Sequence, residues 1–335
     1  MNQPADETKP PVLPTRSLNY AGIDEVSGAG LIDVEDSLLA DTTVVRSPLR
    51  DAARRFSQNW AAVLSLAIVL LLILVAITAH WLHTSDPNAL DYNAIDQGPS
   101  VAHWFGTDPE GRDEYTRILY GLRVPFLVSL IGTFLTVVLG MGFGLVAGFY
   151  GKIMDSILSR FTDLMFAFPS FLLTVIIVSL YGNTFDTHFP NGTGRAVILT
   201  AVFALVSWPP LMRFVRSLAL TMKEQQFIEA ARTVGTSGPK IIWRHLAPNT
   251  YGLVLVQAAL TVAFILAAEA VLSILGLGVI TPTPDLGAML YDGSNYMDAN
   301  YWGVFFPSLF LTVLILSFTF IGDGVRDAVD PRSQH

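Results

Sequence analysis

Residues 61–79, AAVLSLAIVLLLILVAITA, decide the fold class of this protein. The stretch carries no charge, and at about 1.5 Å per residue it is long enough to cross a hydrocarbon core of roughly 30 Å as one helix. Trp60 and Trp81 flank it, at the positions where aromatic residues meet a membrane interface. This stretch therefore predicts a helix that spans a lipid bilayer.

The whole chain has the composition of a polytopic membrane protein. Of 335 residues, 52% are hydrophobic and 14% are charged, and the mean hydropathy is +0.49. A soluble domain carries about 25% charged residues. Further uncharged runs of spanning length occupy residues 124–151, 164–185, 196–212, 246–268 and 299–322. We predict an all-α membrane protein with six transmembrane helices.

The distribution of Lys and Arg predicts its orientation. With the N-terminus inside, sixteen of the 20 cationic residues lie in the cytoplasm, and cationic loops close to the spans are retained there. The four outside are Arg112, Arg117, Arg123 and Arg195. Both termini are therefore predicted to be cytoplasmic.

The sequence divides into five segments. Residues 1–45 hold eight acidic side chains against Lys9 and Arg16, which is typical of a disordered cytoplasmic tail. We expect the first transmembrane helix within 46–83, an external segment over 84–123, a five-helix core over 124–325 and a C-terminal tail over 326–335. Within the core, the prolines and glycines of residues 276–301 predict short external elements.

The sequence lacks the residues that several classes of function require. The chain has no cysteine, which excludes disulfides and thiolate chemistry, and it has no basic stripe for nucleic acid. Its six histidines are scattered, and no acid, base and nucleophile converge. Residues 235–240, GTSGPK, lack the spacing of a phosphate-binding loop. We predict a transport protein that is not an enzyme, with no metal and no cofactor of its own.

One carboxylate interrupts the uncharged spans. Glu269 lies 18 residues after Tyr251, which places it about 27 Å along a helix and near the outer boundary. A structural role, such as accepting hydrogen bonds from external backbone or pairing with Arg123, is favoured over a proton relay, which would lie near the midplane.

Glycine recurs every four residues in the second span, at Gly140, Gly144 and Gly148. Small residues at this spacing predict a close helix–helix contact in lipid. Such a contact suits either a dimer face or a moving interface inside a transporter, and the spacing does not separate the two.

The loop over residues 213–249 carries the strongest functional signal. Residues 224–234, EQQFIEAARTV, predict an amphipathic helix whose apolar stripe includes Phe227, Ile228, Ala231 and Val234. Gly235 is its predicted C-terminal cap, and a second helical pattern over 240–246 runs into Pro248. A helix of this kind can lie on lipid or dock into the groove of a partner.

This loop resembles the EAA loop of permease subunits in bacterial binding-protein-dependent ABC importers, with Glu229, Ala230, Ala231, Gly235 and Pro248 at the family's spacings. Its ending, RHLAPN, departs from the general I-x-L-P pattern and is similar to the variant of peptide importers. The stretches at 105–123, 144–151, 161–173, 269–278 and 322–332 resemble signatures of the C-type permease of dipeptide, oligopeptide and nickel systems.

The resemblance implies one N-terminal helix followed by a five-helix importer core in the bacterial plasma membrane. The implied partners are a homologous B-type permease, two ABC ATPase subunits that bind ATP and Mg, and an extracytoplasmic substrate-binding protein. The loop helix would be the coupling helix that docks on the ATPase, through Phe227, Glu229, Ala230, Ala231, Gly235 and Pro248.

The expected function is therefore a permease subunit that forms half of the translocation path for di- or oligopeptides. One alternative is the same architecture importing nickel or another small solute. The other is an ion-coupled secondary carrier, which the absence of midplane charge disfavours.

Overall fold

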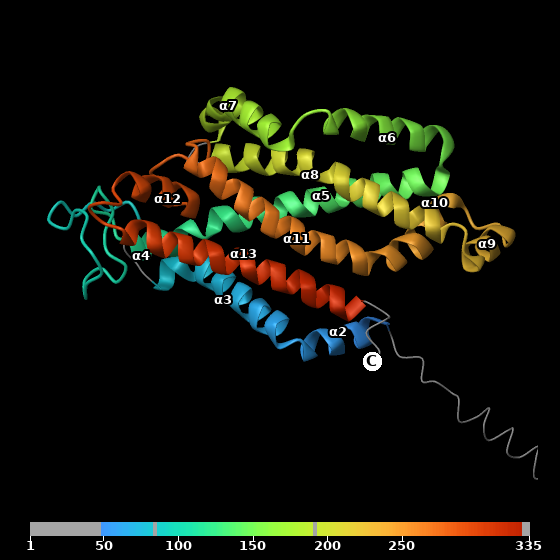
Figure 1. Ribbon diagram of the computed structural model, residues 1–335, viewed down its shortest axis with the longest axis horizontal. Coiled ribbons are helices and arrows are strands. Elements are labelled where there is room, and N and C mark those ends of the chain that lie inside the picture. The colour runs from blue at the N-terminus through green and yellow to red at the C-terminus, as the bar shows by residue number, and fades with distance from the viewer. Residues whose placement is uncertain (1–47, 83–85, 190–192, 330–335) are drawn as a thin grey trace, which may run out of the picture. The chain divides into compact units, whose positions relative to one another are not determined.

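The computed structural model describes residues 48–82, 86–189 and 193–329. The predicted tail at 1–45 lies outside these ranges. Within them the regular elements are helices, shown in Figure 1. They are α2 (Pro48–Gln58), α3 (Trp60–Leu82), α4 (Glu114–Gly121), α5 (Arg123–Tyr150), α6 (Lys152–Phe166), α7 (Ser170–His188), α8 (Thr193–Met222), α9 (Gln226–Thr233), α10 (Gly238–Ile241), the π-helical turn η1 (Ile242–Leu246), α11 (Ala247–Ile274), α12 (Leu286–Asn295) and α13 (Trp302–Val329).

Six of the described helical segments are long and apolar enough to cross a membrane, which confirms the predicted fold class. They are Trp60–Leu82, Glu114–Tyr150, Ser170–His188, Thr193–Met222, Gly238–Ile274 and Trp302–Val329. Several extend past the uncharged runs. In particular, α8 continues to Met222 and α13 to Val329, so much of the predicted loop 213–249 and the start of the predicted tail 326–335 are helical.

The predicted third span, 164–185, is wrong at its start. Residues 167–169 interrupt the helix, so that α6 ends at Phe166 and α7 begins at Ser170. Pro169 causes the break, because proline cannot donate a backbone hydrogen bond and disfavours helical geometry at the residue before it. Figure 1 shows α6 and α7 following one another along α8.

The central contact of the bundle joins α5 to α8. Gly140, Gly144 and Gly148 all face α8: a methyl group on Gly144 would lie 2.7 Å from the carbonyl oxygen of Met212, and one on Gly148 would lie 2.5 Å from Cβ of Ala219. The glycines therefore serve close packing inside the chain, and this stripe is not available as a dimer face.

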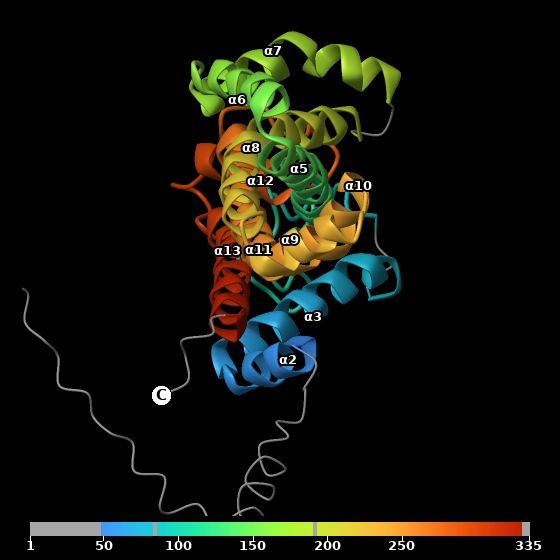
Figure 2. The same cartoon turned by 90° about the vertical axis from the view of Figure 1, so that its right-hand side faces the viewer.

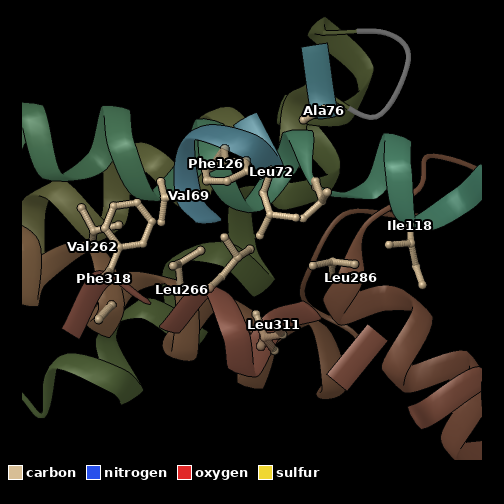
Figure 3. Close-up of a cluster of buried hydrophobic side chains, with 14 of the residues drawn as sticks. Val69, Leu72, Ala76, Ile118, Phe126, Val262, Leu266, Leu286, Leu311 and Phe318 are labelled. Carbon is tan, nitrogen blue, oxygen red and sulfur yellow. The ribbon is translucent and has the colours of Figure 1, made fainter. Parts of the chain in front are cut away.

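A second hydrophobic core lies on the side of α5 and α11 opposite to α8. It joins α3, α5, α11 and α13, and Figure 3 shows its side chains meeting between these helices; they include Val69, Leu72, Phe126, Val262, Leu266, Leu311 and Phe318. Figure 2 shows the resulting order, with α6 and α7 at one edge of the bundle and α2 and α3 at the other.

Gly144→Ala is expected to destabilise the bundle by about 1–3 kcal/mol, the usual cost of overpacking a filled contact. Gly142→Ala is the matched control on the same helix, because nothing lies within 4 Å of a methyl group there. The control should be neutral or more stable by up to about 1 kcal/mol. Thermal unfolding of the two variants in detergent compares them, and equal unfolding temperatures would contradict the packing role.

Candidate functional site

The short helix α9 is fixed to the body of the chain by its inner face. Ile228 is fully buried there, and Ala231 packs against the same cluster. The cluster contains side chains from α5, α8, α10, η1 and α11, among them Leu145, Val215, Ala219, Ile241, Leu246 and Val254. Burying an isoleucine side chain stabilises this attachment by roughly 1.5–3 kcal/mol. Consequently α9 moves with the helices on which it packs.

The C-terminal end of α9 is closed by a Schellman motif. The backbone N–H of Thr236 donates to the carbonyl of Ala231 at 3.0 Å, and that of Gly235 donates to the carbonyl of Arg232 at 2.9 Å. Gly235 has φ +79°, a conformation that glycine adopts without steric cost. The predicted cap is confirmed, and it gives this short helix a defined end.

The outer face of α9 is exposed among the residues that the structure describes. Phe227, Glu229, Ala230 and Val234 are exposed there, with Val234 85% accessible. The predicted apolar stripe is thus divided between two faces, because Ile228 and Ala231 point into the protein and Phe227 and Val234 point away. An exposed surface with apolar groups and one carboxylate is suited to docking on another protein.

The helical pattern that follows α9 does not end at Pro248. Instead, Pro248 lies in the first turn of α11, directly after the π-helical turn η1. Proline has no N–H for the carbonyl of Arg244 four residues earlier, and the wider turn accommodates this loss. The ring of His245 in η1 lies 6.5 Å from that of Phe227, measured between centroids, so η1 lies beside α9.

Two ion pairs join α6 to α8. Asp155 pairs with Arg216, and Asp163 pairs with Arg213. Arg213 also lies over the ring of Phe166, 4.1 Å from its centroid. Local sequence patterns cannot reveal these pairs, because the partners are 61 residues apart for Asp155 and 50 residues apart for Asp163.

Glu269 belongs to a buried polar cluster at the end of α11. The hydroxyl of Ser273 lies 3.0 Å from Oε1 of Glu269 and 3.3 Å from Oδ2 of Asp285, and Asp285 caps α12 by accepting the N–H of Ala288. The suggested pair with Arg123 is wrong, because the Arg123 guanidinium donates to the carbonyl of Ala76. Glu269 thus helps to attach the segment after α11 to that helix. Burial raises the pKa of Asp285 to about 6.

The predicted external segment is a packed unit with buried charges. Asp108 accepts from Arg112 at 2.5 Å and lies 3.6 Å from Arg117, and all three side chains are at most 4% exposed. Asn300, just before α13, donates to the carbonyl of Thr107 at 3.0 Å. These contacts join residues before α5 to residues before α13, which sequence spacing alone could not show.

Comparison with known proteins places this arrangement in a family. Residues 140–335 match the family described as binding-protein-dependent transport system inner membrane component. The chain belongs to this family. Residues 47–99 also match the N-terminal transmembrane domain of oligopeptide transport permease C, which identifies the chain as a C-type permease and accounts for α3 preceding the five-helix core.

Three relatives illustrate the similarity. The dipeptide transport system permease protein DppC of Alkalihalophilus pseudofirmus is 37% identical, over 85% of this chain and 90% of the relative. The oligopeptide permease OppC of Haemophilus influenzae is 37% identical, over 86% and 90%. The glutathione permease GsiD of Pectobacterium atrosepticum is 36% identical, over 86% and 92%.

Gly235→Val is expected to loosen the end of α9 by about 1–2 kcal/mol, because a left-handed conformation is unfavourable for a residue with a Cβ atom. Gly235→Asn is the control, since asparagine tolerates this conformation and nothing lies within 4 Å of a Cβ atom there. Hydrogen exchange of the α9 amides should be faster in the valine variant alone. Equal exchange in both would contradict the capping role.

The contribution of Asp285 to stability is expected to fall as pH rises from 3.8 to about 6. Folding raises the pKa of this carboxyl from 3.8 to about 6, so between these values the folded state binds the proton more tightly than the unfolded state. Asp285→Asn keeps an oxygen for the α12 cap and removes this dependence, which is worth about 1–3 kcal/mol. Unfolding temperatures between pH 4 and 7 test this. The exposed Asp298→Asn should keep the slope, and an unchanged slope in Asp285→Asn would contradict the assignment.

Proposed function

We propose that this chain is the membrane subunit of an ATP-driven importer and forms half of the translocation path for di- or oligopeptides that an extracytoplasmic binding protein delivers. The observation that carries the proposal is the two-sided helix α9. Its inner face is buried against α5, α8 and α11, and its outer face is exposed in the described part of the chain. Family membership and the peptide permeases among the relatives support the same conclusion.

The outer face of α9 is the proposed docking surface for an ABC ATPase. Docking there would require α9 and both termini to lie in the cytoplasm, as the distribution of Lys and Arg predicts. ATP and Mg would bind in the two ATPase subunits, and a homologous B-type permease would complete the path. Because α9 is held by Ile228, displacement of the docked ATPase would move α5, α8 and α11 with it.

Coupling of ATP hydrolysis to transport also sets an energetic requirement for the docking contact. A contact of equal strength in the inward-facing and outward-facing states shifts neither state, so the docking energy of α9 must differ between them. Glu229 is suited to this role, since an exposed carboxylate gains or loses a cationic partner as the docked surface moves.

Peptides are favoured over the alternative cargoes. Systems for nickel share several of the sequence signatures, but the relatives compared above are named for dipeptide, oligopeptide and glutathione transport. A substrate-binding protein supplied by the system would select the peptide length.

Glu229→Lys is expected to lower peptide uptake about tenfold or more, which corresponds to roughly 1.4 kcal/mol of lost docking free energy. ATP hydrolysis by the assembly should lose its stimulation by peptide, while the membrane level of the chain stays normal. Glu224→Lys is the matched control, because Glu224 is also exposed but precedes α9. Full peptide uptake by Glu229→Lys would count against docking through this face.

A further inference from the structure

A cleft opens between α7, α8 and α11. Its volume is about 270 Å³, and it is lined by Ser170 of α7, Ser207 and Pro210 of α8, and Thr261 and Phe264 of α11. Ser207 lies close to the midpoint of α8, and Thr261 lies close to the midpoint of α11. The cleft is therefore placed near the middle of the bilayer, and no ionisable side chain lines it.

The break between α6 and α7 and the proline pair inside the continuous helix α8 meet at this cleft. On one side, the break at residues 167–169 leaves the N-terminus of α7 without a side-chain cap, so its first backbone N–H groups lack intrahelical acceptors. On the other side, Pro209 and Pro210 lie inside α8. Neither proline can donate a hydrogen bond to the carbonyl four residues earlier, on Leu205 and Val206.

The break and the two prolines are at the same level of the bundle, because Ser170 and Leu173 of α7 line a pocket together with Val206 and Pro209 of α8. Phe161 of α6 stacks on Trp208 with ring centroids 5.8 Å apart, whereas Val178 of α7 packs with Leu199 and Phe203. The break between α6 and α7 is therefore opposite the part of α8 that holds its prolines. Irregular backbone at membrane depth is tolerated where it lines a cavity, and interrupted helices in transporters surround the substrate.

A second observation points to a ligand. Ser207 is 9% exposed, and its hydroxyl is buried with no hydrogen-bond partner. A buried polar group left without a partner costs about 1–3 kcal/mol. The wall of the cleft thus contains a buried hydroxyl group without a partner, close to backbone carbonyls and amides that lack their regular helical partners.

We propose that this cleft is the segment of the translocation path that binds the backbone of the transported peptide. A peptide unit presents one N–H donor and one C=O acceptor. The carbonyl of Val206, which lines the cleft, would accept from a peptide N–H group, and the Ser207 hydroxyl and the first amides of α7 would donate to the peptide carbonyls. The inference rests on the proposed function and deepens it.

This chemistry has a consequence for selectivity. Contacts to the peptide backbone are shared by all sequences, and an uncharged lining neither attracts nor repels a charged side chain strongly. The path would therefore pass peptides of different sequence. A path of this kind suits an importer in which the binding protein selects the peptide. The volume lies just under the usual range of about 300–1,000 Å³ for ligand sites, consistent with a second permease supplying the opposite wall.

The absence of native cysteine allows a direct test. Ser207→Cys is assembled with its partner subunits in proteoliposomes and treated with a small hydrophilic thiol reagent, with and without trialanine and its binding protein. We expect labelling in the absence of peptide. When the peptide concentration is ten times the dissociation constant for the cleft, labelling should be about tenfold slower, since the fraction of clefts without peptide falls by that factor.

Ser57→Cys is the control, because Ser57 is exposed on α2 and does not line the cleft; its labelling should not respond to peptide. If Ser207→Cys fails to assemble, Thr261→Cys tests the opposite wall of the same cleft.

Three outcomes separate the two proposals. Unchanged labelling of the cleft cysteine during active trialanine uptake would overturn the cleft assignment and leave the proposed function intact. A cysteine that the reagent never reaches would also overturn it, since lipid or a partner helix would then fill the cleft. Vesicles that hydrolyse ATP and take up no peptide would instead contradict the proposed function.

Discussion

The hydrocarbon core of a bilayer offers no hydrogen-bond partner to a backbone N–H or C=O group, and this constraint governs the structure. It requires helices in the spans, and it makes every interruption of a span costly unless neighbouring groups compensate. The described chain breaks its helical path at residues 167–169, carries Pro209 and Pro210 inside the continuous helix α8, and forms a π-helical turn before Pro248. The first two lie beside the cleft, and the third lies beside α9. The departures from regular helix thus coincide with the two surfaces to which we assign function.

Close packing connects these two surfaces. The stripe of Gly140, Gly144 and Gly148 brings the backbone of α5 against α8, and α8 carries both the prolines of the cleft and part of the cluster that holds Ile228. A densely packed contact of this kind transmits displacement because it has little free volume to absorb it. Movement imposed on α9 would therefore reach the cleft through α8, and the ion pairs of Asp155 and Asp163 would carry α6 along.

The sequence predicted the features that depend on local patterns. Uncharged runs predicted the number of spans. The four-residue spacing of glycine predicted a close helix–helix contact, which α5 makes with α8, and Gly235 after an amphipathic pattern predicted the end of α9. It failed where the determining contact is distant in sequence. One error had a local cause instead: the start of the third span was misplaced because Pro169, which separates α6 from α7, lies inside the uncharged run. The partners of Glu269 depend on how the segment after α11 folds back, and the unpartnered hydroxyl of Ser207 is visible only in three dimensions.

The most direct measurement of the central claim is uptake of radiolabelled trialanine into proteoliposomes of defined composition. One set holds this chain alone under an ion gradient, and the other holds the complete assembly of both permeases, both ATPases and the binding protein, with ATP available to the ATPases. We predict accumulation in the complete assembly only, and none when its ATPases are hydrolysis-deficient. Accumulation by the single chain would contradict the account, because the energy for transport would then enter through this polypeptide itself.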